Sequence, residues 1–145
     1  MVTWKTEADT VPLHTVLIVS DHQENIAVWE THFGRRNCIV LSETNVPDAL
    51  QTARLVGPSL MLLDLKLSKP ERLSLLAGLR AASRGPILML ITADTVDEIV
   101  EANQEGADEC LVRPVNPSVL VIKAMAWLSH SQRSERMPAL LDDTL

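Results

Sequence analysis

SLMLLD, residues 59–64, is the stretch of this sequence that decides the fold. Four apolar side chains follow one another without a polar residue between them, and the carboxylate of Asp64 ends the run. A strand with one face in water alternates apolar and polar residues, whereas a strand covered by helices on both faces is apolar at nearly every position. Residues 59–64 are therefore predicted to form a buried strand of a parallel sheet.

Similar apolar runs recur on both sides of this stretch. They are TVLIVS at 15–20, NCIVL at 37–41, PILMLIT at 86–92 and ECLV at 109–112. The segments that follow the five runs carry apolar residues three and four positions apart, which is typical of helices with one buried face. These segments are 22–34, 46–56, 71–83, 95–105 and 117–134. Five strand–helix units with right-handed crossovers predict an α/β fold, a doubly wound five-stranded parallel sheet with helices on both faces.

Length and composition limit the class of protein. A chain of 145 residues suits one domain, and 46% hydrophobic with 22% charged residues is typical of soluble globular proteins. The net charge of −6 disfavours direct binding to nucleic acid. The apolar runs are far shorter than the ~20 residues that cross a bilayer, and the first ten residues do not resemble a signal peptide. We expect a cytoplasmic protein that does not enter the membrane.

The ends of the chain fall outside the alternation of strands and helices. We expect an N-terminal segment of residues 1–13, one domain of residues 14–134 and a C-terminal tail of residues 135–145. Cys38 and Cys110 show no spacing typical of a metal site, so both are predicted to be buried free thiols.

Polar residues stand where the predicted strands end. Ser20 and Asp21 follow the first strand, Asp64 ends the third, Thr92 ends the fourth and Arg113 follows the fifth. The carboxyl ends of parallel strands meet at one edge of the sheet, and open α/β sheets bind their ligands there. We therefore expect the functional site at this edge.

Four segments, VLIVSD, PSLMLLDLKL, ILMLITAD and GADECLVRP, resemble in order and spacing the characteristic segments of bacterial response-regulator receiver domains. The resemblance covers roughly residues 13–130. It implies the flavodoxin-like strand order 2-1-3-4-5 and a role in two-component phosphorelay signalling. The implied partners are a histidine kinase or phosphotransfer protein, a downstream effector protein reached through altered protein–protein interaction, and a second copy in a homodimer. Such a domain is a signalling module and not an enzyme.

The resemblance also implies roles for the residues at the strand ends. Asp64 takes the phosphoacceptor position, where a carboxylate attacks a phosphoryl group. Thr92 would donate its hydroxyl to a phosphoryl oxygen, and Arg113 stands where the family carries a lysine. Asp21, Asp64 and the backbone carbonyl of Lys66 would hold Mg²⁺, which neutralises charge on the phosphoryl oxygens.

Four positions depart from the family pattern, and at one of them Ser68 replaces a proline four residues after Asp64, so that loop is expected to be reshaped. Receivers usually carry two adjacent acidic residues after the first strand, and Ser20 replaces one of them, so the affinity for Mg²⁺ should fall. Arg113 keeps the charge of the lysine but replaces a compact ammonium with a planar fork. Cys110 takes the place of the aromatic residue that reports phosphorylation to the surface, so that relay is expected to be missing or rebuilt.

These departures leave two other functions open. The first is a pseudo-receiver, a phosphorylation-independent binding or dimerisation module in which Arg113 is a permanent internal cation. The second is an enzyme of the haloacid dehalogenase type with Asp64 as nucleophile. It is disfavoured because that chemistry needs a second acid where Lys66 stands.

Overall fold

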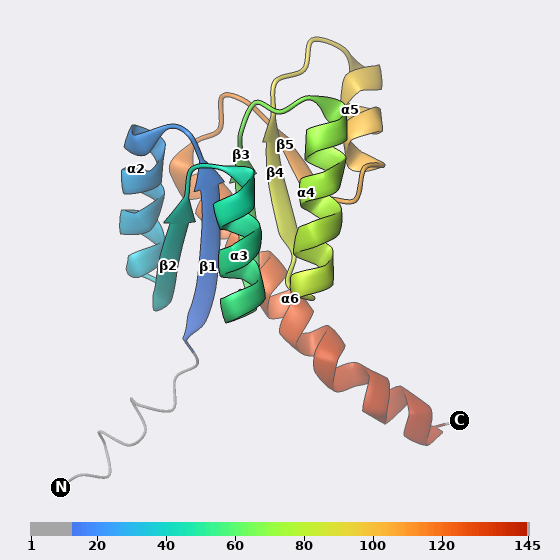
Figure 1. Cartoon of the computed structure of the whole chain (residues 1–145). Helices are drawn as coiled ribbons and strands as arrows, with labels where there is room; N and C mark the ends of the chain where they lie inside the picture. Colours follow the sequence, from blue (N-terminus) through green and yellow to red (C-terminus); the bar gives the residue numbers. More distant parts are fainter. Residues whose placement is uncertain (1–12, 145) are drawn as a thin grey trace, which may run out of the picture.

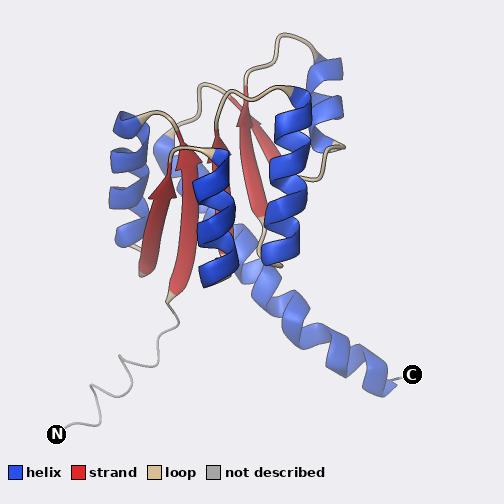
Figure 2. Ribbon diagram, viewed as in Figure 1, coloured by secondary structure: helices blue, strands red, loops and turns tan. Residues whose placement is uncertain are grey.

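The structure, a computed structural model of the chain, describes residues 13–144, with side chains described up to residue 130. Parallel strands form a sheet that has helices on both faces (Figure 1 and Figure 2). The strands are β1 (His14–Ser20), β2 (Cys38–Glu43), β3 (Leu60–Asp64), β4 (Ile87–Ile91) and β5 (Glu109–Val112). The helices are α2 (Gln23–Gly34), α3 (Val46–Val56), α4 (Lys69–Ala82), α5 (Val96–Asn103) and α6 (Pro117–Thr144).

The strands lie in the order β2-β1-β3-β4-β5, and every neighbouring pair is parallel. This confirms the predicted doubly wound fold and the strand order that the resemblance implied. β3 lies at the centre, and all five of its residues are buried. The chain reverses its direction across the sheet between β1 and β3, where Ser20 pairs in register with Asp64. In open α/β sheets this reversal point is where ligands bind.

Two clusters of apolar side chains hold the helices on the two faces of the sheet. Successive residues of a strand point to opposite faces. Val16 therefore packs with Phe33 of α2 and Leu120 of α6, whereas its neighbour Leu17 packs with Leu75 of α4 on the other face. In Figure 1, α3 and α4 lie in front of the sheet, with α6 behind it. The core thus fixes the central strand ends from both sides.

Two element boundaries differ from the prediction for local reasons. β2 continues to Glu43 instead of ending at residue 41, because it keeps pairing with β1. The Ser42 side chain is exposed, and the half-buried Glu43 accepts a hydrogen bond from the Thr52 hydroxyl of α3. α4 begins at Lys69 instead of residue 71. The Ser68 hydroxyl accepts a hydrogen bond from the backbone N–H of Glu71, whose side chain accepts from the Ser68 N–H, forming a capping box.

The last helix is longer than predicted. α6 runs through Pro117–Thr144, because no glycine beyond residue 106 ends it where the predicted helix stopped at residue 134. The expected segment 1–13 lies almost wholly outside the described residues, and the expected junction between residues 134 and 135 falls inside α6. The division of the chain at these points stays a prediction. Among the described residues, no helix is long and apolar enough to cross a lipid bilayer.

The two cysteines agree with the strand order. Cys38 begins β2 and Cys110 lies in β5, so they stand on opposite edges of the sheet as free thiols. Both are half-buried instead of buried as predicted, because an edge strand has a neighbour on one side only.

Candidate functional site

Asp64 ends the central strand with a side chain that is only 1% exposed. An ionised carboxylate taken out of water requires partners, and both of its oxygens have them. Oδ1 accepts two hydrogen bonds from Arg113, one from Nε at 2.9 Å and one from Nη2. Oδ2 accepts from the Ser20 hydroxyl at 3.0 Å and from the side-chain amide of Asn25 at 3.4 Å. The carboxylate is therefore neutralised and oriented by one cation and two neutral donors.

Arg113 also joins this carboxylate to the hydroxyl at the end of β4. Its Nη1 donates to Thr92 Oγ1 at 3.0 Å, and its backbone N–H donates to the carbonyl of Ile91 at 2.8 Å. Its peptide bond to Pro114 is cis. A planar guanidinium can contact the carboxylate and the threonine at the same time, which is the geometric difference from a lysine ammonium. The structure thus brings together three of the strand-end residues that the resemblance singled out, Asp64, Thr92 and Arg113.

Two neutral donors complete the site. Ser20, which stands where the family carries an acidic residue, is fully buried. Its hydroxyl donates to Asp64 and accepts from the backbone N–H of His22 at 3.1 Å. Asn25 was not predicted to be a site residue. Its one sequence signal is its position four residues after Asp21, in the first turn of α2, which starts directly above the end of β1.

Asp21 lies outside this hydrogen-bonded cluster. Its side chain is 51% exposed, and one of its oxygens lies 3.4 Å from Nε2 of His22. Within the described part of the chain, no group of three or more His, Cys, Asp or Glu side chains gathers closely enough to hold a metal ion. The predicted set of Asp21, Asp64 and the Lys66 carbonyl contains only two such side chains, so it stays a prediction.

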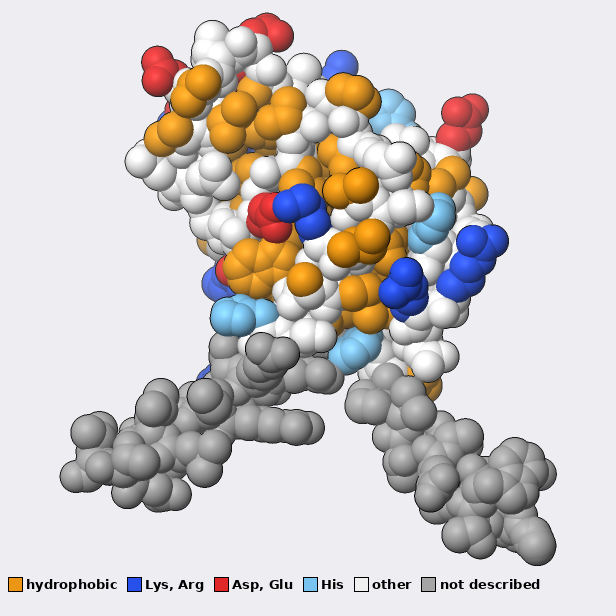
Figure 3. Space-filling view, turned by 180° about the vertical axis from the view of Figure 1, so that it is seen from behind, with side chains coloured by type: hydrophobic (Ala, Val, Ile, Leu, Met, Phe, Trp, Pro, Cys, Tyr) orange, Lys and Arg blue, Asp and Glu red, His pale blue; other side chains and the backbone are white. Residues whose placement is uncertain are grey.

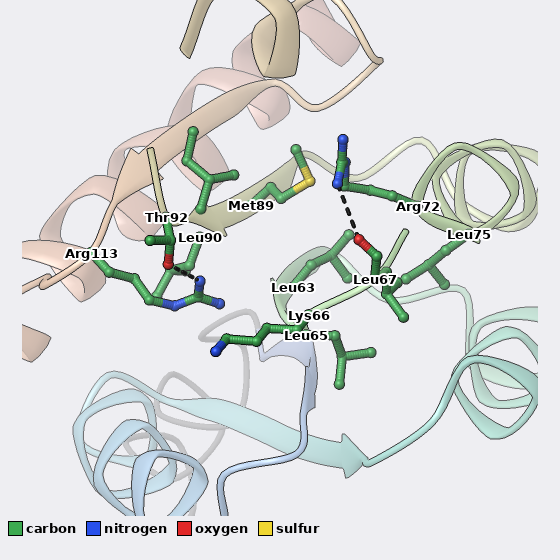
Figure 4. A pocket seen from close by; sticks show the side chains of 11 residues that line it. Leu63, Leu65, Lys66, Leu67, Arg72, Leu75, Met89, Leu90, Thr92 and Arg113 are labelled. Atoms are coloured by element: carbon green, nitrogen blue, oxygen red, sulfur yellow. Dashed lines mark hydrogen bonds between the residues drawn. The ribbon is translucent and has the colours of Figure 1, made fainter. Parts of the chain in front are cut away.

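Two hollows of about 300 Å³ each flank Arg113. One has apolar walls from β3, β4 and α4, and the side chains of Lys66, Thr92 and Arg113 line its polar end (Figure 4). The other lies between α2 and the start of α6 and includes Asp64 and Asn25 in its wall. Arg113 is thus the partition between the hollow that reaches the carboxylate and the hollow beside α4.

Residues 16–125 match the family model of the response regulator receiver domain. The nisin biosynthesis regulatory protein NisR of Lactococcus lactis subsp. lactis is 27% identical over 123 residues, which cover 85% of this chain and 54% of that protein. The transcriptional regulatory protein SrrA of Staphylococcus aureus is 26% identical over 117 residues, 81% of this chain and 48% of SrrA. The chain thus spans about half the length of these curated relatives.

Solved structures give the same picture of the fold. A response regulator of Burkholderia pseudomallei, crystallised with a phosphorylated aspartic acid, a calcium ion and citrate, is 25% identical with a TM-score of 0.67 and covers 86% of this chain and 74% of its own. The signal receiver domain of a putative Luxo repressor protein from Vibrio parahaemolyticus superposes with a TM-score of 0.76 at 20% identity, over 87% of this chain and 98% of its own. The second likeness concerns the fold alone.

Proposed function

Because the chain belongs to the family of response regulator receiver domains, which are signalling domains and not enzymes, we propose that it is phosphorylated at Asp64 in two-component signalling. The observation that carries the proposal is the set of donors gathered on this buried carboxylate. An acyl phosphate at Asp64 would add phosphoryl oxygens, and hydrogen bonds to such charged oxygens are strong. Arg113 and Thr92, already joined at 3.0 Å, would donate to them.

Ser20 and Asn25 have a separate part in this proposal. Both donate to Oδ2 of Asp64, whereas the arginine donates to Oδ1. A carboxylate whose two oxygens have different donors is held in one orientation, which places one defined oxygen for attack on a phosphoryl group. These two residues would therefore position the nucleophile and not contact the phosphoryl group.

A divalent cation fits the donor set, although less well than in a site with three carboxylates. Asp21, Asp64 and the backbone carbonyl of Lys66 offer the oxygen ligands that Mg²⁺ prefers, and Mg²⁺ commonly uses only one or two protein carboxylates. Ser20 offers a hydroxyl where a carboxylate would bind more strongly. When bound, the cation would neutralise charge on the phosphoryl group. The Burkholderia pseudomallei relative, with its phosphorylated aspartic acid and calcium ion, supports this assignment.

The proposed partners follow from family membership. The phosphoryl donor would be a histidine kinase or a phosphotransfer protein, and the phosphorylated chain would change its interaction with a downstream effector protein or with a second copy of itself. We place this signalling in the cytoplasm. The net charge of −6 gives no support to direct nucleic-acid binding.

One observation favours a second candidate, a phosphorylation-independent binding or dimerisation module. Asp64 already has a cation inside the protein, because Arg113 donates two hydrogen bonds to one of its oxygens. In such a module this ion pair would be permanent, and the fold would present a fixed surface to its partner.

Chemical phosphorylation separates the two candidates. The chain is incubated with a small acyl-phosphate donor, with and without Mg²⁺, and its intact mass is measured before and after. The receiver gains one phosphoryl group only when Mg²⁺ is present. Asp64→Asn should gain none, and Asp97→Asn, which changes an exposed carboxylate in the first turn of α5, should behave like the natural chain. No gain on a natural chain with an intact circular dichroism spectrum favours the permanent module, and labelling of Asp64→Asn identifies a different acceptor.

A further inference from the structure

A buried ion pair joins α4 to the turn that follows α5. Arg72 donates from Nε and Nη2 to the two carboxylate oxygens of Glu105, at 2.5 and 2.6 Å. The Glu105 side chain is 3% exposed and that of Arg72 is 26% exposed. A buried ion pair adds little stability over an apolar pair of the same size, and its best-attested role is to select one arrangement. This pair is therefore a candidate for fixing the position of α5 against α4.

The same arginine reaches the loop behind the phosphoacceptor. Its Nη1 donates to the carbonyl oxygen of Leu67 at 3.3 Å, three residues beyond Asp64 (Figure 4). Arg72 lines the same hollow as Lys66 and Arg113. It also lines another hollow, of about 260 Å³ and distinct from the two beside Arg113, whose wall includes Glu105. One guanidinium thus forms the wall between loop 65–68 and α5.

The turn that carries Glu105 is hydrogen-bonded to the last turn of α5 and is expected to move with that helix. The backbone N–H of Glu105 donates to the carbonyl of Ala102 at 3.1 Å, which continues the last turn of the helix. Ala102 is buried against the sheet on the same face as Leu75 of α4. A displacement of Glu105 therefore moves α5 and not an isolated loop.

We propose that Arg72 is a positioning residue that couples loop 65–68 to α5 through Glu105, so that a change at Asp64 reaches α5 through this ion pair. The guanidinium is planar and its donors have fixed directions, so its bonds to Leu67 and Glu105 cannot both survive if the loop moves without α5. Cys110 occupies the position where the family carries an aromatic relay, and the ion pair supplies the rigid connection that a cysteine side chain lacks. The coupling itself is a property of the fold, and only its trigger rests on the proposed function.

A matched control lies one helical turn away on both helices. Lys69 and Glu101 form an ion pair at 2.6 Å between α4 and α5, with side chains 54% and 56% exposed. This pair joins α4 to α5, but exposed ion pairs contribute little, and within the described part of the chain the Lys69 ammonium donates to Glu101 and not to loop 65–68. Lys69→Gln therefore removes a charge between the same helices without touching the proposed connection.

Amide hydrogen exchange of the full chain tests the coupling without phosphorylation. Arg72→Gln should accelerate exchange about tenfold in both residues 65–68 and residues 96–105, whereas Lys69→Gln should leave residues 65–68 within about twofold of the natural chain. Arg72→Glu should act like Arg72→Gln, and adding Glu105→Arg to it should restore protection in residues 96–105 but not in residues 65–68, because a carboxylate at position 72 cannot donate to the Leu67 carbonyl. Unchanged exchange of residues 65–68 in Arg72→Gln, or no recovery of residues 96–105 in the charge-swapped pair, overturns the proposal.

A second arm adds the phosphoryl group. After chemical phosphorylation, verified by intact mass, exchange in residues 96–105 should change in the natural chain and stay within about twofold in Arg72→Gln. Equal responses of the two phosphorylated chains overturn Arg72 as the connection. If the natural chain takes up no phosphoryl group, the proposed function fails while the first arm still decides the coupling.

Discussion

Replacing Arg113 with methionine tests how the buried carboxylate is maintained. The substitution removes the cation and keeps most of the apolar stem, so Asp64, 1% exposed, retains only Ser20 and Asn25 as donors. Removing one partner of a fully buried ion pair costs about 3–5 kcal/mol. The Arg113 side chain is 25% exposed and two donors remain, so we expect a loss of about 2–3 kcal/mol in the free energy of unfolding.

The assay is urea unfolding followed by circular dichroism at pH 7, on Arg113→Met, Asp64→Asn and the double variant. Asparagine has no charge to neutralise, so the double variant should lose less than the sum of the single losses, by at least about 1 kcal/mol. Lys123→Met is the matched control, because it breaks an ion pair with Glu109 in which the side chains are 44% and 26% exposed. It should cost no more than about 1 kcal/mol.

Two results would refute this reasoning. One is a loss in Arg113→Met no larger than the loss in Lys123→Met. The other is strict additivity in the double variant, which would mean that the arginine stabilises the fold independently of the Asp64 charge.

Three further predictions concern the frame around the site. Ser68→Ala removes the capping box of α4 and should lower the free energy of unfolding by about 1 kcal/mol in the same urea assay; no change would show that the cap is dispensable. Gly85→Ala should lower the free energy of unfolding by about 1–3 kcal/mol, because a Cβ there would lie 2.5 Å from the backbone oxygen of Ser59. At Gly34 an added Cβ would meet nothing within 4 Å, so Gly34→Ala should be neutral or stabilising. Equal effects of the two substitutions would contradict this. Burial raises the pKa of the Cys110 thiol to about 11, so its alkylation, measured by mass, should be slow at pH 8 and rise about tenfold per pH unit below that pKa. A rate at pH 8 equal to that of free cysteine would show that the thiol is not protected.

The order and type of the strands and helices could be predicted from the sequence, because segments that are buried in the fold are rich in apolar residues. β3 reads LMLLD, and all of these residues are buried, as a strand covered on both faces requires. β2 was predicted too short because Ser42 and Glu43 continue an edge strand, where polar side chains are permitted and the apolar signal ends early. The predictions were therefore accurate at the centre of the sheet and weaker toward its edge.

The functional site, like the sheet, could be predicted from the sequence only in part. Asp64, Thr92 and Arg113 each stand at the end of a strand, so the topology alone brings them together. Asn25 reaches Asp64 across 39 residues of sequence, and Arg72 reaches Glu105 across 33. Amide and charged side chains are ordinary on helix surfaces, so these contacts become visible only when the packing of the helices is known.

Arg113 and Arg72 share one geometric feature, because each is hydrogen-bonded to two structural elements. Arg113 joins Asp64 to Thr92, and Arg72 joins Leu67 to Glu105, on different parts of the wall of one hollow (Figure 4). In each case, if one element moves and keeps its bonds to the arginine, the bonds between the arginine and the other element must break. Such a site favours two discrete arrangements over gradual displacement.

The exposed apolar side chains on and near α5 would change their surroundings if α5 moved. Val96 and Val100 of α5 are 73% and 48% exposed, and Ile122 of α6 is 59% exposed. Figure 3 shows apolar side chains spread over the back of the molecule, with a few charged side chains among them and other charged groups toward the rim. A rotation of α5 would change which side chains lie beside Val96 and Val100 on the surface. The difference in a partner's affinity for the two arrangements would then determine how far binding of that partner shifts their equilibrium.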